Sequence, residues 1–151
     1  MATATPCSPL RERNRSGSVQ GMPHAVAPFT VEHMDDEELV EQDPGVRYSR
    51  ARLAKTFHGD IEGRSTVEML SLRAQSGSAG YVALERVVGS LHGQSGSFAL
   101  LHVATMSGTG QWGRWLVVPG SGVGDLEGIS GEGHIDVAEG AHTFHLDYAL
   151  S

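Results

Sequence analysis

Gly89-Ser90-Leu91-His92-Gly93-Gln94-Ser95 is one of three copies of a single pattern, Gly-x-Ile/Leu-x-Gly-x-Ser, along this chain. The other two copies are Gly59-Asp60-Ile61-Glu62-Gly63-Arg64-Ser65 and Gly124-Asp125-Leu126-Glu127-Gly128-Ile129-Ser130. Successive copies begin 30 and 35 residues apart, an interval that suits two strands and two turns. Strand geometry would place both glycines and the aliphatic residue of a copy on one face, where glycine permits a sharp bend. We therefore predict that the copies are corners of a sheet that closes into a barrel. The alternative is a set of ordinary turns in a glycine-rich chain.

Alternation of apolar and polar residues predicts strands along most of the chain. The clearest strand lies at the C-terminal end, where Phe144, Leu146, Tyr148 and Leu150 alternate with other residues. Further strands are expected at 29–31, 47–57, 65–74, 81–88, 97–106 and 111–118, with a final hairpin over 131–150 and a loop or helical turn over 32–43. About eight strands with short connections predict an all-β fold, a closed antiparallel barrel. A β-sandwich is the alternative.

Length and composition indicate one domain with a tail. The chain has 151 residues, and residues 1–26, rich in Ser, Pro, Gly and Arg, are predicted to be a disordered tail before a single barrel domain at 27–151. No apolar run approaches the roughly 20 residues of a membrane helix, and no signal peptide is recognisable. The one cysteine, Cys7, allows no internal disulfide. We expect a cytoplasmic protein.

The charge distribution argues against nucleic acid and membrane surfaces as partners. The formal net charge is −7, and the first 26 residues carry three arginines against one glutamate. The barrel region is therefore more acidic than the whole chain and would repel phosphate groups.

Four segments carry a resemblance to a known family: ERVVGSLHGQSGSF at 85–98, VPGSGVGDL at 118–126, TFHGDIEG at 56–63 and LDY at 146–148. Over residues 27–151 the chain resembles the bacterial family called domain of unknown function 3224. Val123 stands where that family more often has threonine. The resemblance implies an antiparallel barrel similar to allene oxide cyclase, often a homo-oligomer, and brings no assigned activity or catalytic residues.

The strand at 81–88 is apolar on both faces except at Glu85 and Arg86. We expect it to be buried inside by the core and outside by a partner surface or the N-terminal segment. The phase of the repeat places Glu85 in the interior, where an apolar environment would raise its pKa and suit it to acid/base work. The alternative is a structural ion pair with Arg50, Arg52 or Arg86, or a position on an oligomer face.

Other residues complete the candidate ligand site at the barrel mouth. With Glu85 and Arg86 we include His102, Trp115 and Tyr148, because each is a polar or aromatic residue within an apolar strand. Glu68 is a second carboxylate that could pair with Glu85, although strand parity places it on the opposite face.

We expect no metal and no cofactor. The eight histidines have no cysteine cluster beside them, and the only set worth testing as metal ligands is His92, His102 and His134. The glycine-rich stretch at 118–124 lacks the Gly-Lys-Ser/Thr ending of a phosphate-binding loop.

These observations favour a small barrel that binds a small, largely apolar molecule or forms a homo-oligomer. A cofactor-independent isomerase or cyclase is the first alternative, with Glu85, Arg86, His102 or Tyr148 supplying one proton or hydrogen bond. A non-catalytic oligomeric interaction module is the second. The sequence is compatible both with an enzyme and with a protein that has no catalytic activity. An enclosed cavity would favour binding or catalysis, whereas a filled barrel would favour the interaction module.

Overall fold

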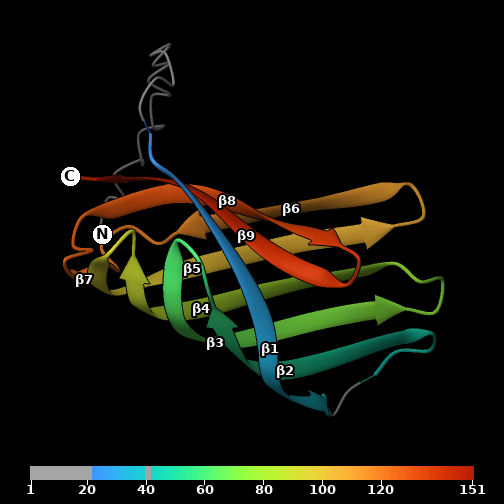
Figure 1. Cartoon of the computed structure of the whole chain (residues 1–151). Coiled ribbons are helices and arrows are strands. Elements are labelled where there is room, and N and C mark those ends of the chain that lie inside the picture. The colour runs from blue at the N-terminus through green and yellow to red at the C-terminus, as the bar shows by residue number, and fades with distance from the viewer. Residues whose placement is uncertain (1–21, 40–41) are drawn as a thin grey trace, which may run out of the picture.

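The computed structural model describes residues 22–39 and 42–151, which form an all-β structure (Figure 1). Its strands are β1 (His24–Glu38), β2 (Val46–Phe57), β3 (Ile61–Ala74), β4 (Ala79–Leu91), β5 (Gln94–Ser107), β6 (Gly110–Val117), β7 (Val123–Gly124), β8 (Ile129–Ala138) and β9 (Ala141–Leu150). Within the described ranges, no helix has the length and hydropathy needed to cross a membrane.

Eight of these strands close into an antiparallel barrel. The order around the ring is β1-β2-β3-β4-β5-β6-β8-β9, and β9 pairs with β1 to complete it. The short strand β7 pairs with β5 beyond the end of β6. The ladders differ greatly in length: β4 and β5 pair from Ala79 to Leu91, whereas β6 and β8 share only Trp115↔Gly133 and Leu116↔Glu132. The predicted closed barrel is confirmed.

The first strand is longer than predicted. β1 begins at His24, inside the segment assigned to the tail, and continues to Glu38 through the stretch expected to be a loop or helical turn. The acidic residues are compatible with a strand because β2 supplies arginines opposite them: Arg47 Nε lies 3.0 Å from Glu38 Oε1. A register shift after Val31 marks the point where β1 leaves the core. Residues 1–21 of the predicted tail, including Cys7, lie outside the described residues.

Four glycines lie side by side across the sheet where the strands bend. Gly63 of β3 pairs with Gly89 of β4, Gly89 with Gly96 of β5, and Gly96 with Gly124 of β7. A Cβ atom at Gly63 would overlap the carbonyl oxygen of Val88. We call these four residues the glycine row. A Cβ at Gly63, Gly89 or Gly96 would overlap a backbone carbonyl oxygen, and Gly124 has a positive φ of 72°, so the backbones can approach closely here and the sheet can curl.

The repeat supplies three of the four glycines of the glycine row, but not in the predicted manner, and Gly96 directly follows the second copy. Each copy lies at a turn at the same end of the barrel, with one glycine in the row and the other in the turn at positive φ: Gly59 at 91°, Gly93 at 80° and Gly128 at 80°. The prediction that both glycines share one strand face was wrong, because the turn falls inside the motif. The aliphatic residue of each copy is at most 1% exposed: Ile61, Leu91 and Leu126.

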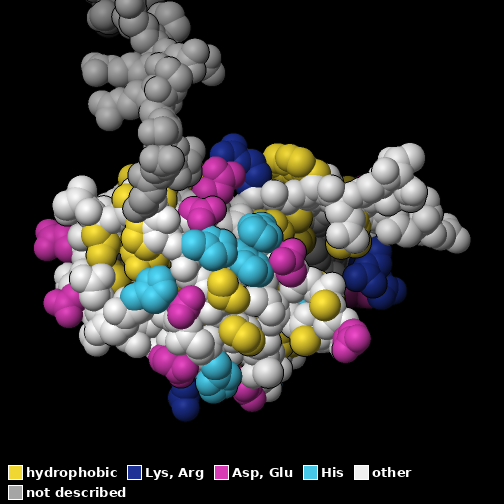
Figure 2. Space-filling model, turned by 45° about the horizontal axis from the view of Figure 1, so that its top comes forward, with side chains coloured by type: hydrophobic (Ala, Val, Ile, Leu, Met, Phe, Trp, Pro, Cys, Tyr) yellow, Lys and Arg dark blue, Asp and Glu magenta, His cyan; other side chains and the backbone are white. Residues whose placement is uncertain are grey.

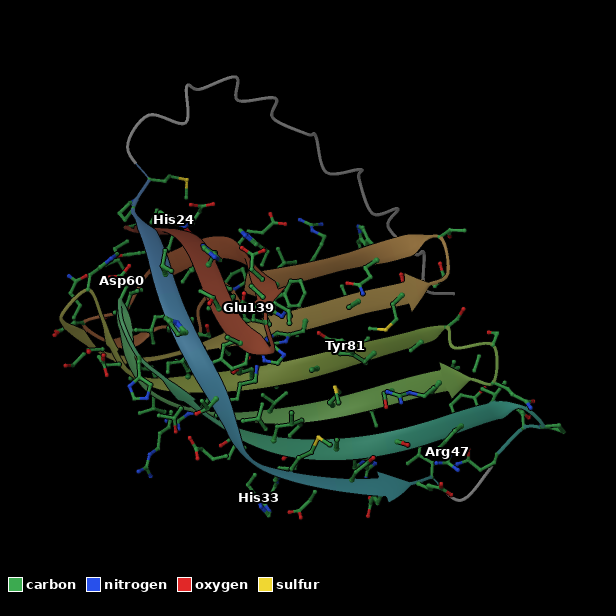
Figure 3. The ribbon with its side chains drawn as sticks, turned by 45° about the vertical axis from the view of Figure 1, so that its right-hand side comes forward. His24, His33, Arg47, Asp60, Tyr81 and Glu139 are labelled. Carbon is green, nitrogen blue, oxygen red and sulfur yellow. The ribbon has the colours of Figure 1, made fainter. Side chains whose placement is uncertain are left out.

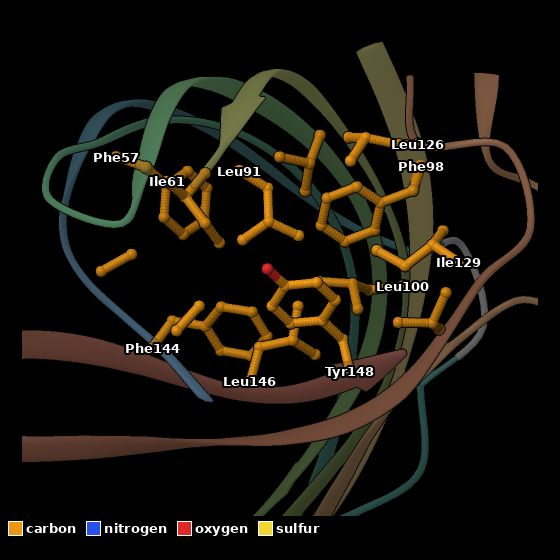
Figure 4. Packing of buried hydrophobic residues seen from close by; sticks show 14 of the residues in the cluster. Phe57, Ile61, Leu91, Phe98, Leu100, Leu126, Ile129, Phe144, Leu146 and Tyr148 are labelled. Carbon is orange, nitrogen blue, oxygen red and sulfur yellow. The ribbon is translucent and has the colours of Figure 1, made fainter. Parts of the chain in front are cut away.

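The core fills the end of the barrel that carries the glycine row (Figure 4). Aromatic side chains from distant strands meet there: the ring centroids of Phe29 and Phe57 are 5.3 Å apart, and those of Phe57 and Phe144 are 6.3 Å apart. Beyond this packed end, the hairpins of β2 to β6 extend farther than the β8–β9 hairpin, whose tip carries Glu139 (Figures 1 and 3).

Gly63→Ala is expected to lower the free energy of unfolding by about 2–3 kcal/mol, because the added methyl group would meet neighbouring backbone atoms. Gly108→Ala is the matched control, since no atom lies within 4 Å of the position that its Cβ would take and its φ is not positive. The control should change stability by less than about 0.5 kcal/mol. Denaturant titration of both variants measures this, and equal effects would contradict the role of the glycine row.

Candidate functional site

A buried polar cluster lies inside the barrel beyond the packed end. Glu85 of β4 is 1% exposed, and both of its carboxylate oxygens are in use. Oε1 accepts a hydrogen bond from the Ser65 hydroxyl. Oε2 lies 3.3 Å from Lys55 Nζ and 2.7 Å from His102 Nε2. The carboxylate is thus held by three side chains from three other strands.

Strand register brings these side chains together. Ser65 of β3 lies directly between Lys55 of β2 and Val87 of β4, two residues along from Glu85. Because the serine side chain is small, the lysine can reach across β3 to the carboxylate. The ammonium group also stands 4.6 Å from the centroid of the Phe29 ring, a favourable position for a cation on an aromatic face.

The environment of Glu85 lowers its pKa instead of raising it. Burial alone would raise the pKa of this carboxyl, but contacts with His102, Lys55 and Ser65 outweigh burial and bring the pKa below its ordinary value of 4.5. The predicted interior position was right, and the predicted rise was wrong because local sequence identifies no partner for the charge. An ionised carboxylate with occupied oxygens is a poor proton donor.

His102 and Trp115 extend the cluster toward β6. They are cross-strand partners, and their ring centroids are 5.7 Å apart. The His102 Nε2 contact with Glu85 is short but not aligned as a hydrogen bond. Trp115 Nε1 is buried and has no hydrogen-bond partner among the described residues. Buried donors of this kind are commonly satisfied by an ordered water molecule.

The other candidate residues lie elsewhere. Arg86 is exposed on the outside of β4. Tyr148 belongs to the packed end, where its hydroxyl is 2.6 Å from Nδ1 of His92 in the β4–β5 turn. Glu68 faces outward, as strand parity predicted, and is bound to Arg52, so it forms no pair with Glu85. The arginines considered as partners of Glu85 do not fill that role.

Sequence reasoning missed Lys55 as the partner of Glu85. One signal could have found it, because Lys55 is the only lysine and lies two residues before the inward-facing Phe57 on the same strand. The histidine set considered for metal binding does not assemble among the described residues. His92 lies in a turn at the packed end, His102 lies inside, and His134 lies on the outer surface of β8.

An apolar groove of about 560 Å³ lies on the outer surface of β3 to β6. Its rim on the β2–β3 side carries Arg50 and Glu68. Six aliphatic residues form what we call the outer apolar face: Leu70, Val82, Leu84, Leu101, Val103 and Leu116. Four of them are about half exposed, at 46% for Leu70, 52% for Val82, 51% for Leu84 and 48% for Leu101.

Comparison with known proteins identifies the family. Residues 25–148 match the family model described as "Protein of unknown function (DUF3224)". The chain belongs to the DUF3224 family. It is also similar to a crystal structure of a DUF3224 protein of unknown function from Shewanella oneidensis MR-1, with 38% sequence identity and a TM-score of 0.80, over 87% of this chain and 99% of the other. No curated protein matches this DUF3224 chain.

Breaking the buried pair should destabilise this DUF3224 protein strongly. Glu85→Gln leaves Lys55 buried without its counter-charge, so we expect a loss of about 3–5 kcal/mol in the free energy of unfolding. Replacing both residues, as Lys55→Met with Glu85→Leu, should recover most of that loss. The exposed pair Arg52 and Glu68 is the control, for which Glu68→Gln should cost less than about 1 kcal/mol. Failure of the double variant to recover stability would contradict a charge-based role.

The lowered pKa of Glu85 also predicts a pH dependence of stability. The pKa of Glu85 in the folded protein lies below 4.5, its ordinary value. As the pH falls, the unfolded chain therefore binds a proton at this carboxyl before the folded protein does. The stabilisation is complete above about pH 4.5 and is lost as the pH falls through the folded-state pKa. Urea unfolding below pH 4.5 should therefore show stability falling more steeply with acid in the wild type than in Glu85→Gln. Equal slopes would contradict the lowered pKa.

Proposed function

We propose that this protein is a self-associating β-barrel module whose outer apolar face packs against the same face of a second copy. The observation that carries the proposal is the exposure of aliphatic side chains on adjacent strands, with Leu84 and Leu101 directly paired across β4 and β5. Exposed apolar patches of this kind mark interaction sites in folded proteins. The strand at 81–88, apolar on both faces, was expected to be covered on its outer side by a partner surface or the N-terminal segment.

A second copy suits the charges around this face. The rim beside β2 and β3 carries Arg50 and Glu68, and Glu68 is bound to Arg52. On the opposite side, Arg114 is the cross-strand partner of Val103, and Glu132 is the cross-strand partner of Leu116. A two-fold axis in the plane of the interface brings either the opposite rims or the same rims of two copies together. Both rims hold charges of each sign, so either arrangement can place an arginine opposite a glutamate. The acidic character of the whole chain is therefore not an obstacle at this face.

The interior gives less support to a ligand site or a catalytic site. Core side chains fill one end of the barrel, and the polar cluster beyond it uses both oxygens of its one carboxylate. The apolar groove on the outside has a volume within the range of small-molecule sites, so a small apolar ligand is the competing occupant of the same face.

We place the protein in the cytoplasm, and its single cysteine suits a reducing compartment.

Light scattering after size exclusion should give a dimer or a higher symmetric oligomer for the wild type at micromolar concentration. Leu84→Lys inserts a charge at the centre of the outer apolar face, so the same measurement should give a monomer. Val137→Lys is the matched control, because Val137 is 63% exposed on β8, away from that face, and its variant should remain associated.

Two results would overturn the proposal: a monomeric wild type, or an unchanged oligomer in Leu84→Lys. In the first case, fluorescence titration with an apolar probe such as 1-anilinonaphthalene-8-sulfonate tests the competing occupant. Binding by the monomeric wild type that Leu84→Lys abolishes would assign the groove to a small ligand. Circular dichroism of both variants verifies that they fold.

A further inference from the structure

Three histidines and two aspartates form a cluster on the outside of β1, β8 and β9, which Figure 2 shows as histidines gathered beside acidic side chains. His134 of β8 is the cross-strand partner of His145 of β9, and Asp136 lies two residues beyond His134 on the same face. His24 of β1, labelled in Figure 3, is in turn the cross-strand partner of Asp147. The cluster thus contains two His-x-Asp pairs on neighbouring strands.

The side chains of four of these residues form a chain of short contacts. Asp147 Oδ1 lies 2.7 Å from His24 Nδ1, and His24 Nε2 lies 3.1 Å from His145 Nδ1. At the far end, His145 Nε2 lies 3.1 Å from Asp136 Oδ2. Both nitrogens of His24 and both nitrogens of His145 are therefore engaged.

This chain of contacts needs a further positive centre. Three contacts require three bridging hydrogens, ionised aspartates bring none, and two neutral imidazoles bring one each. One contact would then set a nitrogen lone pair against the lone pair of an oxygen or of another nitrogen. An extra proton would supply the missing hydrogen, or a metal cation would take its place. At the contact between His145 and Asp136, a metal cation would face the neutral nitrogen and carboxylate oxygen that such ions bind.

The ligand atoms at that end have the spacing of a metal site. His134 Nε2 lies 3.8 Å from Asp136 Oδ2, and the three ligand atoms of His134, Asp136 and His145 all lie within 4.8 Å of one another. Tetrahedral zinc with bonds of about 2.0–2.1 Å separates its ligand atoms by about 3.3 Å. The two imidazole rings stand parallel, with centroids 4.7 Å apart. The His134 side chain is 56% exposed, so its ring has room to turn toward a shared centre.

We propose that His134, Asp136 and His145 bind a divalent transition metal ion, zinc in the first instance. Two imidazole nitrogens and one carboxylate oxygen form a donor set that suits zinc and leaves a coordination position for water. His24 and Asp147 act as positioning residues. With the metal on Nε2 of His145, its Nδ1–H donates to His24 Nε2, and His24 Nδ1–H donates to Asp147. Such outer contacts fix the tautomer and orientation of a metal-bound histidine.

The test uses tag-free, full-length protein that has been freed of metal with a chelator and then of the chelator. Titration calorimetry with zinc chloride at pH 7.5 should give one site per chain. Cobalt chloride should produce visible absorption bands of a low-coordinate complex, which zinc then removes. His145→Ala and Asp136→Asn should each abolish the site. His142→Ala is the matched control, because His142 is on the same strand but packs against the Phe29 ring, and this variant should bind as the wild type does.

The positioning role has a separate readout. His24→Ala should retain one site per chain but weaken zinc binding by about 10–100-fold. A wild type that binds neither zinc nor cobalt would overturn the proposal. Zinc binding that survives both His145→Ala and Asp136→Asn, or that is equally lost in His142→Ala, would overturn it as well. Circular dichroism of each variant separates loss of the site from loss of the fold.

Discussion

Close contact between backbones at the glycine row is the constraint on which the rest of this DUF3224 structure depends. Where Gly63, Gly89, Gly96 and Gly124 meet, the strands approach without side chains between them, and the sheet can turn back on itself. This curl brings β1 beside β9 and creates an interior and an exterior. The aliphatic residues of the three repeats then fill the interior next to the bend. One sequence pattern therefore supplies three of the four close-packed glycines and three of the core side chains at the same end.

Closure of the barrel also decides which charges can be buried. Inside, Glu85 is isolated from water, so its ionised form depends on Lys55, Ser65 and His102. Outside, the same strands present aliphatic side chains on one part of the surface and ion pairs such as Arg114 with Glu132 nearby. The two faces of β4 illustrate the contrast, because Glu85 points inward and Leu84, its neighbour, points outward. In the middle of β4, a charged side chain therefore lies inside the barrel and an aliphatic side chain lies outside, the reverse of the usual arrangement.

Sequence reasoning recovered the parts of the structure that local patterns determine. Alternation along 144–150 and the repeat of glycine with an aliphatic residue were sufficient for strand type, barrel closure and the inward direction of Glu85. It failed where the outcome depends on contacts between distant strands. The partner of Glu85 comes from β2, and the acidic part of β1 is a strand because Arg47 and Arg50 lie opposite it. The histidine cluster was missed for the same reason: His134, Asp136 and His145 are unremarkable until strand pairing aligns them.

The two-residue ladder between β6 and β8 has a consequence for how the barrel opens. A ring of hydrogen-bonded strands opens first where the fewest bonds must break, and this seam is far shorter than its neighbours. Opening it would turn the closed ring into a curved sheet with two free edges, each a template for an incoming strand. The amide proton of Trp115, which faces β8, would then exchange with solvent ahead of those in the long β4–β5 ladder. Opening would lengthen the edge that β6 already presents over Gly110–Arg114, where β5 is its one partner strand among the described residues.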